Sequence, residues 1–463
     1  MSRDGSGFTG VMLMGVLWLI LASIVPAYGE ELSAERTRHL MIIKGAQLPT
    51  LLGAPLDDYH LESVQQAGLE PIAFQFDEFD QQGNPYFAKS GTPIDGKQGV
   101  LDGSDELVFM YRDAGPKRNA QINPRQGNVA LELQLWDGQE ARYVYLVKGG
   151  SAQSDKHYVR YDSAKTRVET DDYVLQFADN NLLHWQAHYY KHYQDPSKNL
   201  IKGLDLNIHF TVFTPWTQAT LTQEQLKPQI IGIKEGPVRA IVEMDTMVKL
   251  AGVSFPFAKL RMSYVFSQGE VASISWGQIP YVGLLMKAVY GFDFIDAINF
   301  NDLRGSKVMS GKGPREAGVV DGEVAGVEKQ LAIGGIVGDV KHPETLHLED
   351  NYLCLDTGKG YVHLAMQEFY PEALSGKERK ALEDNLTLFT SALGVQYLDD
   401  LTHGPELGYR MGLNAKDIHL DLSGSMEMRF GVRRFFLPTL DAGGPAQFER
   451  EFRHPPVLRV SAI

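Results

Sequence analysis

The chain has 463 residues, of which 43% are hydrophobic and 22% are charged, so it can bury a core and is not a disordered polymer. Forty-four Lys and Arg against 58 Asp and Glu leave a formal charge of -14, which would repel a phosphate backbone and excludes a nucleic-acid partner. The single cysteine, Cys354, excludes an intrachain disulfide, a Cys-based zinc site and an iron–sulfur cluster.

The first segment predicted along the chain is a signal peptide over residues 1–29. Residues 11–25 are uncharged and mostly large and apolar, a run too short for a comfortable membrane span but typical of a signal-peptide core. Ala27 and Gly29 have the small-residue spacing that a signal peptidase reads, so we expect cleavage after Gly29. The uncharged stretch extends over residues 5–29, which leaves retention as a membrane anchor as the alternative. We expect a periplasmic or extracellular protein.

Short alternating runs separated by turn residues predict a mainly β chain of antiparallel β-sandwich-type modules. The clearest hairpin joins residues 129–135 to residues 143–147 around Asp137-Gly138. A longer strand series covers residues 229–276. Further hairpins are predicted for 158–161 with 173–177, 352–355 with 361–366, and 418–422 with 426–432. No phosphate-binding glycine motif interrupts these strands, so nucleotide binding is unsupported.

The sequence also predicts one or two short helices. Ser375 to Glu378 forms a capping-box pattern, and apolar residues follow at helical spacing, which predicts a helix over 375–394. A weaker pattern predicts a second helix over 282–298. The chain exceeds the usual size of one core, so we expect modules over 30–150, 151–300 and 336–463, with a Gly-rich loop or linker over 301–335.

Acidic residues gather in the turns of the predicted N-terminal module. Hard cations such as calcium bind several carboxylate and carbonyl oxygens on flexible turns, so a calcium site is physically reasonable there. The spacing does not match an EF-hand loop, and acidic turns are commonly just solvated. The five candidate ligands are Asp77, Asp80, Asp102, Asp105 and Glu106.

Residues 184–193 contain three histidines and four aromatic rings in one short segment. His184, His188 and His192 are spaced by four, and an even offset places strand residues on one face, which would gather the imidazoles for a metal such as zinc. The rings offer flat, half-polar surfaces that can stack on sugars, with ordinary core packing as the alternative. The predicted ligand-binding residues are Trp185, Tyr190 and Tyr193.

A catalytic version of this segment adds an arginine from the following strand series. In an acidic-polysaccharide lyase, a cation neutralises a uronate while Tyr or His moves protons. We assign these roles to His188, Tyr189 and Arg239, although nothing in the sequence places the three together. Arg239 in a strand-edge ion pair is the ordinary alternative.

The sequence therefore predicts an exported cell-envelope β protein that binds glycan through an aromatic and histidine surface, and it leaves catalysis open. The first alternative is a non-catalytic envelope assembly protein that binds another protein through sheet edges and the Gly-rich loop. The second alternative is a polysaccharide lyase or glycoside hydrolase. A membrane partner is expected only if the N-terminal segment is retained.

Overall fold

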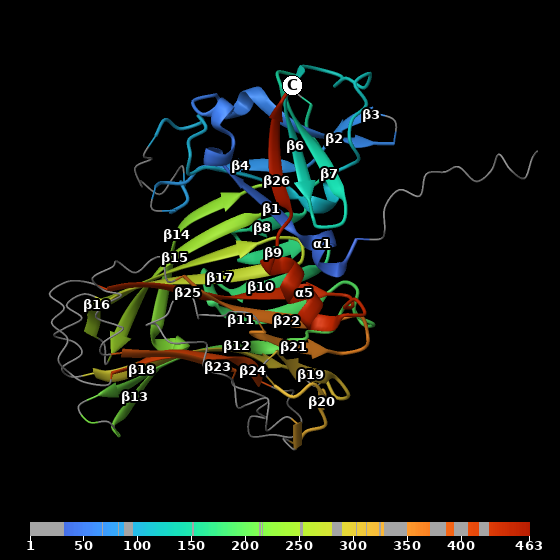
Figure 1. Cartoon of the computed structure of the whole chain (residues 1–463). Coiled ribbons are helices and arrows are strands. Elements are labelled where there is room, and N and C mark those ends of the chain that lie inside the picture. The colour runs from blue at the N-terminus through green and yellow to red at the C-terminus, as the bar shows by residue number, and fades with distance from the viewer. Residues whose placement is uncertain are drawn as a thin grey trace, which may run out of the picture. The chain divides into compact units, whose positions relative to one another are not determined.

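A computed structural model describes residues 32–463 except 67, 82, 88–95, 151, 213, 215, 251–252, 280–288, 302, 312, 324–325, 328–349, 371–385, 393–405 and 416–425. Residues 1–33 form a unit separate from residues 34–463, and the description below concerns the second unit. It is mainly β, as the sequence predicts, and every pair of neighbouring strands in its described part is antiparallel (Figure 1). The predicted signal peptide lies outside the described residues. No described helix is both long and apolar enough to cross a membrane.

The largest of the five sheets has nine strands. Its order is β14 (Leu226–Glu235), β15 (Ala240–Leu250), β16 (Val253–Phe266), β17 (Glu270–Ile279), β25 (Met426–Leu437), β22 (Val362–Phe369), β21 (Tyr352–Asp356), β19 (Lys307–Ser310) and β20 (Gly318–Val319). A five-stranded sheet, which we call the β12 sheet, has the order β13 (Gln218–Thr222), β12 (Ile201–Val212), β18 (Val289–Phe300), β24 (Glu406–Ala415) and β23 (Leu386–Ala392).

The other three sheets are smaller or lie nearer the chain ends. A four-stranded sheet has the order β11 (Asn181–Tyr190), β10 (Tyr173–Ala178), β9 (Arg167–Thr170) and β8 (Val159–Asp162). A second five-stranded sheet has the order β26 (Val457–Ala462), β6 (Asn128–Trp136), β7 (Ala141–Lys148), β2 (Tyr59–Gln65) and β3 (Gly68–Pro71). A three-stranded sheet has the order β1 (Leu40–Lys44), β5 (Glu106–Met110) and β4 (Phe74–Asp77).

Helical structure in the described part is limited to short elements. The α-helices are α1 (Ala34–Arg38) and α5 (Gly444–Arg453). The single turns of 3-10 helix are η1 (Gly45–Gln47), η2 (Pro49–Leu51), η3 (Leu56–Asp58), η4 (Tyr111–Asp113) and η5 (Gln223–Gln225).

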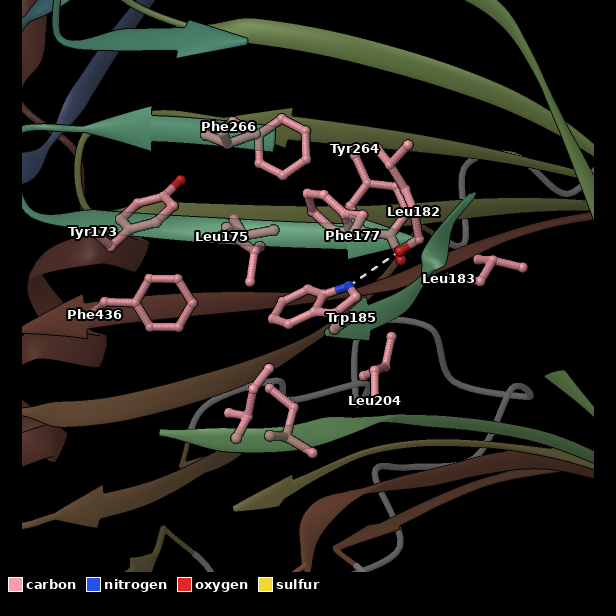
Figure 2. Packing of buried hydrophobic residues seen from close by; sticks show 14 of the residues in the cluster. Tyr173, Leu175, Phe177, Leu182, Leu183, Trp185, Leu204, Tyr264, Phe266 and Phe436 are labelled. Carbon is pink, nitrogen blue, oxygen red and sulfur yellow. Dashed lines mark hydrogen bonds between the residues drawn. The ribbon is translucent and has the colours of Figure 1, made fainter. Parts of the chain in front are cut away.

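One face of the nine-stranded sheet, which we call the core face, packs against the four-stranded and β12 sheets. Its apolar side chains belong to one buried cluster with residues of β10, β11, β12 and β18. Trp185 of β11 lies at the centre of this cluster, and its indole donates a hydrogen bond to the Leu182 carbonyl at 3.1 Å (Figure 2). Burial of this many rings and branched side chains supplies the main driving force for packing the sheets together.

The structure confirms several of the predicted hairpins. β6 pairs with β7, β21 pairs with β22, and strands β14 to β17 follow one another as neighbours over the predicted series. The predicted pairing of 158–161 with 173–177 is wrong, because β9 lies between β8 and β10. The predicted strand at 418–422 lies outside the described residues, and β25 instead pairs with β17 and β22.

Both predicted helices are wrong where the structure describes them. Residues 386–392 of the predicted 375–394 helix form β23, which pairs with β24 over seven residues. Residues 289–298 of the predicted 282–298 helix belong to β18, which lies between β12 and β24. Helical spacing and capping are local signals, whereas a neighbouring strand edge offers a complete ladder of backbone hydrogen bonds. Residues 282–288 and 375–385 lie outside the described part.

The sheets run across the predicted module boundaries. Strands from the predicted modules 151–300 and 336–463 share both the nine-stranded and the β12 sheets. The predicted linker 301–335 supplies β19 and β20 to the nine-stranded sheet. The C-terminal strand β26 pairs with β6 near the start of the chain.

A buried ion pair joins the nine-stranded sheet to the β12 sheet. Arg434 of β25 donates a hydrogen bond from Nη2 to Oδ1 of Asp296 on β18, and a second from Nη1 to the Ser273 hydroxyl at 3.2 Å. The guanidinium also lies over the Trp185 ring, 5.4 Å from its centroid. Arg434 and Asp296 keep 2% and 6% of their surface exposed, so each charge depends on the other for stabilisation.

Removing one member of this pair should destabilise the protein strongly. We expect Asp296→Leu to lower the free energy of unfolding by about 3–5 kcal/mol, because Arg434 then stays buried without its counter-charge. The double variant Asp296→Leu/Arg434→Met should recover much of that loss. Urea unfolding of the three proteins measures both values, and equal losses for the single and double variants would contradict the pairing argument.

Candidate functional site

The second face of the nine-stranded sheet, which we call the polar face, carries charged and aromatic side chains in two neighbouring rows. Residues directly opposite each other on paired strands share a face, and successive strands lie about 4.8 Å apart. The first row runs across β15, β16, β17, β25 and the residue after β22, and consists of Asp245, Arg261, Trp276, Arg429 and Tyr370. The second row consists of Glu243, Ser263, Ile274, Gly431 and Glu368.

Glu243 is the unusual acid of the polar face. It keeps 1% of its surface exposed, and its buried Oε1 atom has no hydrogen-bond partner. Burial raises the pKa of Glu243 to about 7, with Asp245 and Asp80 raising it further and Arg261 and Arg429 opposing the shift. The carboxyl group is therefore divided between its protonated and ionised forms at neutral pH.

Arginines and aromatic rings share the polar face with this acid. The Arg429 guanidinium lies over the Trp276 ring and over the Tyr370 ring, 4.7 Å from each centroid. Arg261 pairs with Asp245 at 3.1 Å, and these two side chains keep 36% and 47% of their surface exposed. The first row is thus open to solvent at Arg261 and Asp245, beside the buried carboxyl group.

Two covers lie over the polar face beyond the second row. The first cover is Phe79 and Phe87, which pack on Ile241 and Val265, and the Phe87 ring occupies the space that a side chain at Gly232 would need. The second cover is helix α5, whose Phe448 packs 5.0 Å from Phe435 between ring centroids. The strand register places both covers on the same side of the two rows.

A groove of about 520 Å³ lies beside the second cover. It is lined by residues of α1, β1, β17, β25, α5 and β26, including Arg433 and Phe435, which share the polar face with Arg429. Its charged groups have protein partners. Glu35 bonds to His39 at 2.5 Å, Arg433 pairs with Glu270 at 2.5 Å, and Arg38 pairs with Asp172 at 2.9 Å. These charged groups of the groove are therefore paired within the protein, unlike the Glu243 carboxyl group.

The sequence-predicted ligand-binding rings lie elsewhere. Trp185, Tyr190 and Tyr193 keep 0%, 0% and 4% of their surface exposed and belong to the core cluster shown in part in Figure 2. These rings therefore pack in the core, which is the alternative given for them in the sequence analysis. They do not form the surface on which the glycan prediction depends.

A β-bulge separates the predicted histidines. Phe177 lies opposite Trp185 whereas Gln176 lies opposite Ala187, so Gln186 is an extra residue in β11. His184 is exposed and His188 is fully buried, because the extra residue reverses the alternation between them. Their predicted gathering on one face is wrong for this reason.

The three predicted catalytic residues have different surroundings. Burial lowers the pKa of His188 to about 3, which keeps its ring neutral, and Tyr361 lies 3.5 Å from its Nδ1 atom. Tyr189 is partly buried on β11. Arg239 is buried and pairs with Asp77 at 2.7 Å and with Glu106 at 2.5 Å. No described contact joins Arg239 to His188 or Tyr189.

The five predicted calcium ligands bond to protein groups. Asp77 and Glu106 hold Arg239, and Asp80 accepts hydrogen bonds from the backbone and side chain of Asn84 at 2.7 and 2.8 Å. Asp102 accepts a hydrogen bond from the Ser104 amide, and Asp105 accepts hydrogen bonds from the amides of Asp102 and Phe79. Burial raises the pKa of Asp105 to about 6. Among the described residues, no group of three or more His, Cys, Asp or Glu side chains is placed to hold a metal ion.

Sequence reasoning missed the residues of the polar face. Glu243 stands in the run Ile241-Val242-Glu243-Met244, where a lone acid in an apolar strand signals a buried carboxyl group. Trp276 and Arg429 are separated by 152 intervening positions, and the register of β17 with β25 brings them opposite each other. Glu243 is thus the one residue of this set that the sequence alone could indicate, because the others become neighbours only through the strand order.

Comparisons with known proteins give distant structural likenesses. No family model and no curated protein matches the chain. An alpha-mannosidase from Enterococcus faecalis V583 is 9% identical with a TM-score of 0.43, and the match covers 93% of this chain and 45% of that one. A glycosyl hydrolase family 38 protein from Enterococcus faecalis is 9% identical with a TM-score of 0.42, covering 93% and 46%.

A protein from Salmonella typhimurium assigned as a mutarotase is 8% identical with a TM-score of 0.28, and the match covers 61% of this chain and 97% of that one. The chain thus spans less than half the length of the two Enterococcus structures. At these scores the folds correspond only in part, and no residue role is transferred from them.

The buried carboxyl group should make stability depend on pH. The pKa of Glu243 is near 4.5 when unfolded and about 7 when folded, so the folded state binds more protons between these values. As pH rises through this range, ionisation of Glu243 should lower the free energy of unfolding of the wild type by up to about 3 kcal/mol. Glu243→Gln has no group at this position that ionises there and should not show this decrease.

Urea unfolding at pH 5 and pH 8 compares the two proteins. We expect Glu243→Gln to match the wild type near pH 5 and to be more stable at pH 8. A wild type that gains stability over the variant between pH 5 and pH 8 would contradict the raised pKa.

Proposed function

We propose that the polar face of the nine-stranded sheet binds a carbohydrate and that Glu243 transfers a proton to or from it. The observation that carries this proposal is the buried Glu243 carboxyl group, whose Oε1 has no protein partner and which shares one face of the sheet with aromatic rings and arginines. A carboxyl group with a pKa near the working pH is suited to general acid–base catalysis. A buried carboxyl group without a partner destabilises the protein, and such groups are commonly found at functional sites.

The side chains of the two rows suit a sugar. A pyranose ring has an apolar face that packs on aromatic rings, and hydroxyl groups that need donors and acceptors. Trp276 and Tyr370 supply the rings, while Arg261, Asp245 and Glu368 supply the polar groups on the same two rows. The glycan-binding function predicted from the sequence is thereby proposed for a different set of residues.

Proton transfer by one group is the chemistry that these residues support best. Glycoside hydrolysis requires two carboxyl groups that flank the scissile bond. Asp245 is the acid next to Glu243 on β15, and it is paired with Arg261. A lyase or epimerase reaction, in which one residue removes or delivers a proton, needs only Glu243 together with groups that stabilise the charge that develops.

The remaining predictions about location and partners stay proposals. Export to the periplasm or beyond depends on residues 1–29, and a retained N-terminal segment would place the protein at a membrane. Binding of another envelope protein through strand edges is the rival function, and it assigns no role to the unpartnered Glu243 carboxyl group.

A pair of matched variants tests the proposal. Glu406 of β24 is also a buried acid whose burial raises its pKa to about 7, but its neighbour in this shift is Asp205 rather than an arginine. Glu243→Gln should lower kcat at least 10²-fold on the sugar that the wild type turns over, while Glu406→Gln should leave kcat within about threefold.

The substrate for this test comes from a screen of the chain from Ala34 onward and the full chain against a panel of neutral and acidic oligosaccharides, read by binding and by product formation. Binding without turnover would reduce the function to recognition. The proposal fails if no oligosaccharide binds, or if both glutamine variants behave alike.

A further inference from the structure

The environment of Arg429 differs from that of the next arginine on the same face. Arg433 pairs with Glu270 at 2.5 Å and approaches Glu368 at 3.5 Å. Among the described residues, Arg429 forms no ion pair, and its buried Nε has no hydrogen-bond partner. Two arginines four residues apart on β25 therefore differ in one respect: one has acidic partners and the other has aromatic rings.

The rings hold the Arg429 side chain without satisfying its donors. A guanidinium stacked on a ring is attracted by the ring face, while its N–H groups point outward in the guanidinium plane. Those donors match the two oxygens of a carboxylate in a bidentate pair. Trp276 on β17 and Tyr370 directly after β22 lie at either side of β25, so they position the guanidinium as a prepared anion site.

The charges on the two rows also favour an anionic group at this place. Asp245 pairs with Arg261, and Arg433 is shared between Glu270 and Glu368. Glu243 has no ion pair with any described residue, and its side chain is buried with an unpartnered oxygen. Although the whole chain has a formal charge of -14, these three arginines equal these three acids in number when Glu243 carries its proton, and Arg429 is the arginine among them that has no acidic partner in the described part of the chain.

We propose that Arg429 binds the carboxylate of an acidic sugar, so that the ligand of the polar face is a uronic-acid-containing oligosaccharide. This inference rests on the proposed carbohydrate function and names its substrate class. Trp276 and Tyr370 hold the cation, and the cation selects the charged sugar. Glu243 lies on the adjacent row, three strands from Arg429, where it can exchange a proton with a neighbouring ring of the bound oligosaccharide. Arg429 acts in this scheme as the specificity-determining residue.

Matched pairs of ligands test the inference. The probes are oligosaccharides of polygalacturonate, alginate and hyaluronate, each compared with its carboxyl-reduced, neutral counterpart by calorimetry. We expect the wild type to bind at least one acidic form at least tenfold more tightly than its reduced form. Salt screens the partly exposed charges, so this preference should weaken as salt rises from about 0.05 to about 0.5 M. We expect the ratio of the two affinities to fall about threefold or more.

Substitutions at Arg429 separate specificity from folding. Arg429→Gln should lower affinity for the acidic form to that of the reduced form and leave the reduced form within about twofold, whereas Arg429→Lys should retain part of the preference. Arg160→Gln, on the exposed side of β8, removes the same charge away from the polar face and should change neither affinity. If Arg429→Gln does not fold, the lysine variant and the wild-type ligand pairs still decide the question.

The outcomes distinguish this inference from the proposed function. Equal affinity for acidic and reduced forms, with turnover still dependent on Glu243, overturns the acidic ligand and retains the carbohydrate function. A preference for the acidic form that survives Arg429→Gln overturns the role of Arg429. Absence of binding to every acidic and neutral oligosaccharide overturns both.

Discussion

The polar face depends on the insertion of strand β25 between β17 and β22. This strand pairs with β17 over ten residues and with β22 over eight, and it thereby joins the two halves of the nine-stranded sheet. The same strand places Arg434 on the core face and Arg429, Gly431 and Arg433 on the polar face. Closing a sheet between segments so distant in sequence costs chain entropy, which the extended backbone ladder and the buried rings offset.

The two faces of this sheet use buried charge differently. On the core face, Arg434 and Asp296 satisfy each other between two sheets, so the pair contributes to the register of packing as well as to stability. On the polar face, Glu243 is buried within the electrostatic reach of Arg261 and Arg429, and one of its oxygens has no partner. A fold optimised for stability alone would fill this position with an apolar side chain, and the retained acid is therefore the main indication of function.

Local patterns in the sequence predicted the strand content well, because alternation and turn residues act within a hairpin. The β6–β7 and β21–β22 hairpins follow directly from such patterns. The β23 and β18 segments were misread as helices, since their strand neighbours come from distant parts of the chain. The assignment of His184 and His188 to one face from their even spacing is wrong, because one extra residue in β11, Gln186, reverses the alternation between them.

The candidate site was less predictable than the fold for the same reason. Trp276, Arg429 and Tyr370 become neighbours through strand register rather than through spacing in the sequence. The aromatic and histidine segment is dense in functional residue types, yet Trp185, Tyr190 and Tyr193 belong to the buried core. Both the rings and Glu243 are buried, and their surroundings distinguish them: the rings pack against apolar side chains, whereas Oε1 of Glu243 has no partner, which is the basis of the proposed role.

The most direct test of the account is a titration of Glu243 in the folded protein. Carboxyl carbon NMR of the protein labelled at glutamate side chains, with Glu243→Gln used to assign the signal, gives the pKa of this group alone. We expect a midpoint near 7, caused by burial and opposed by Arg261 and Arg429. A midpoint near the ordinary glutamate value of about 4.3 would show a solvated carboxylate and would contradict the proposed role of Glu243.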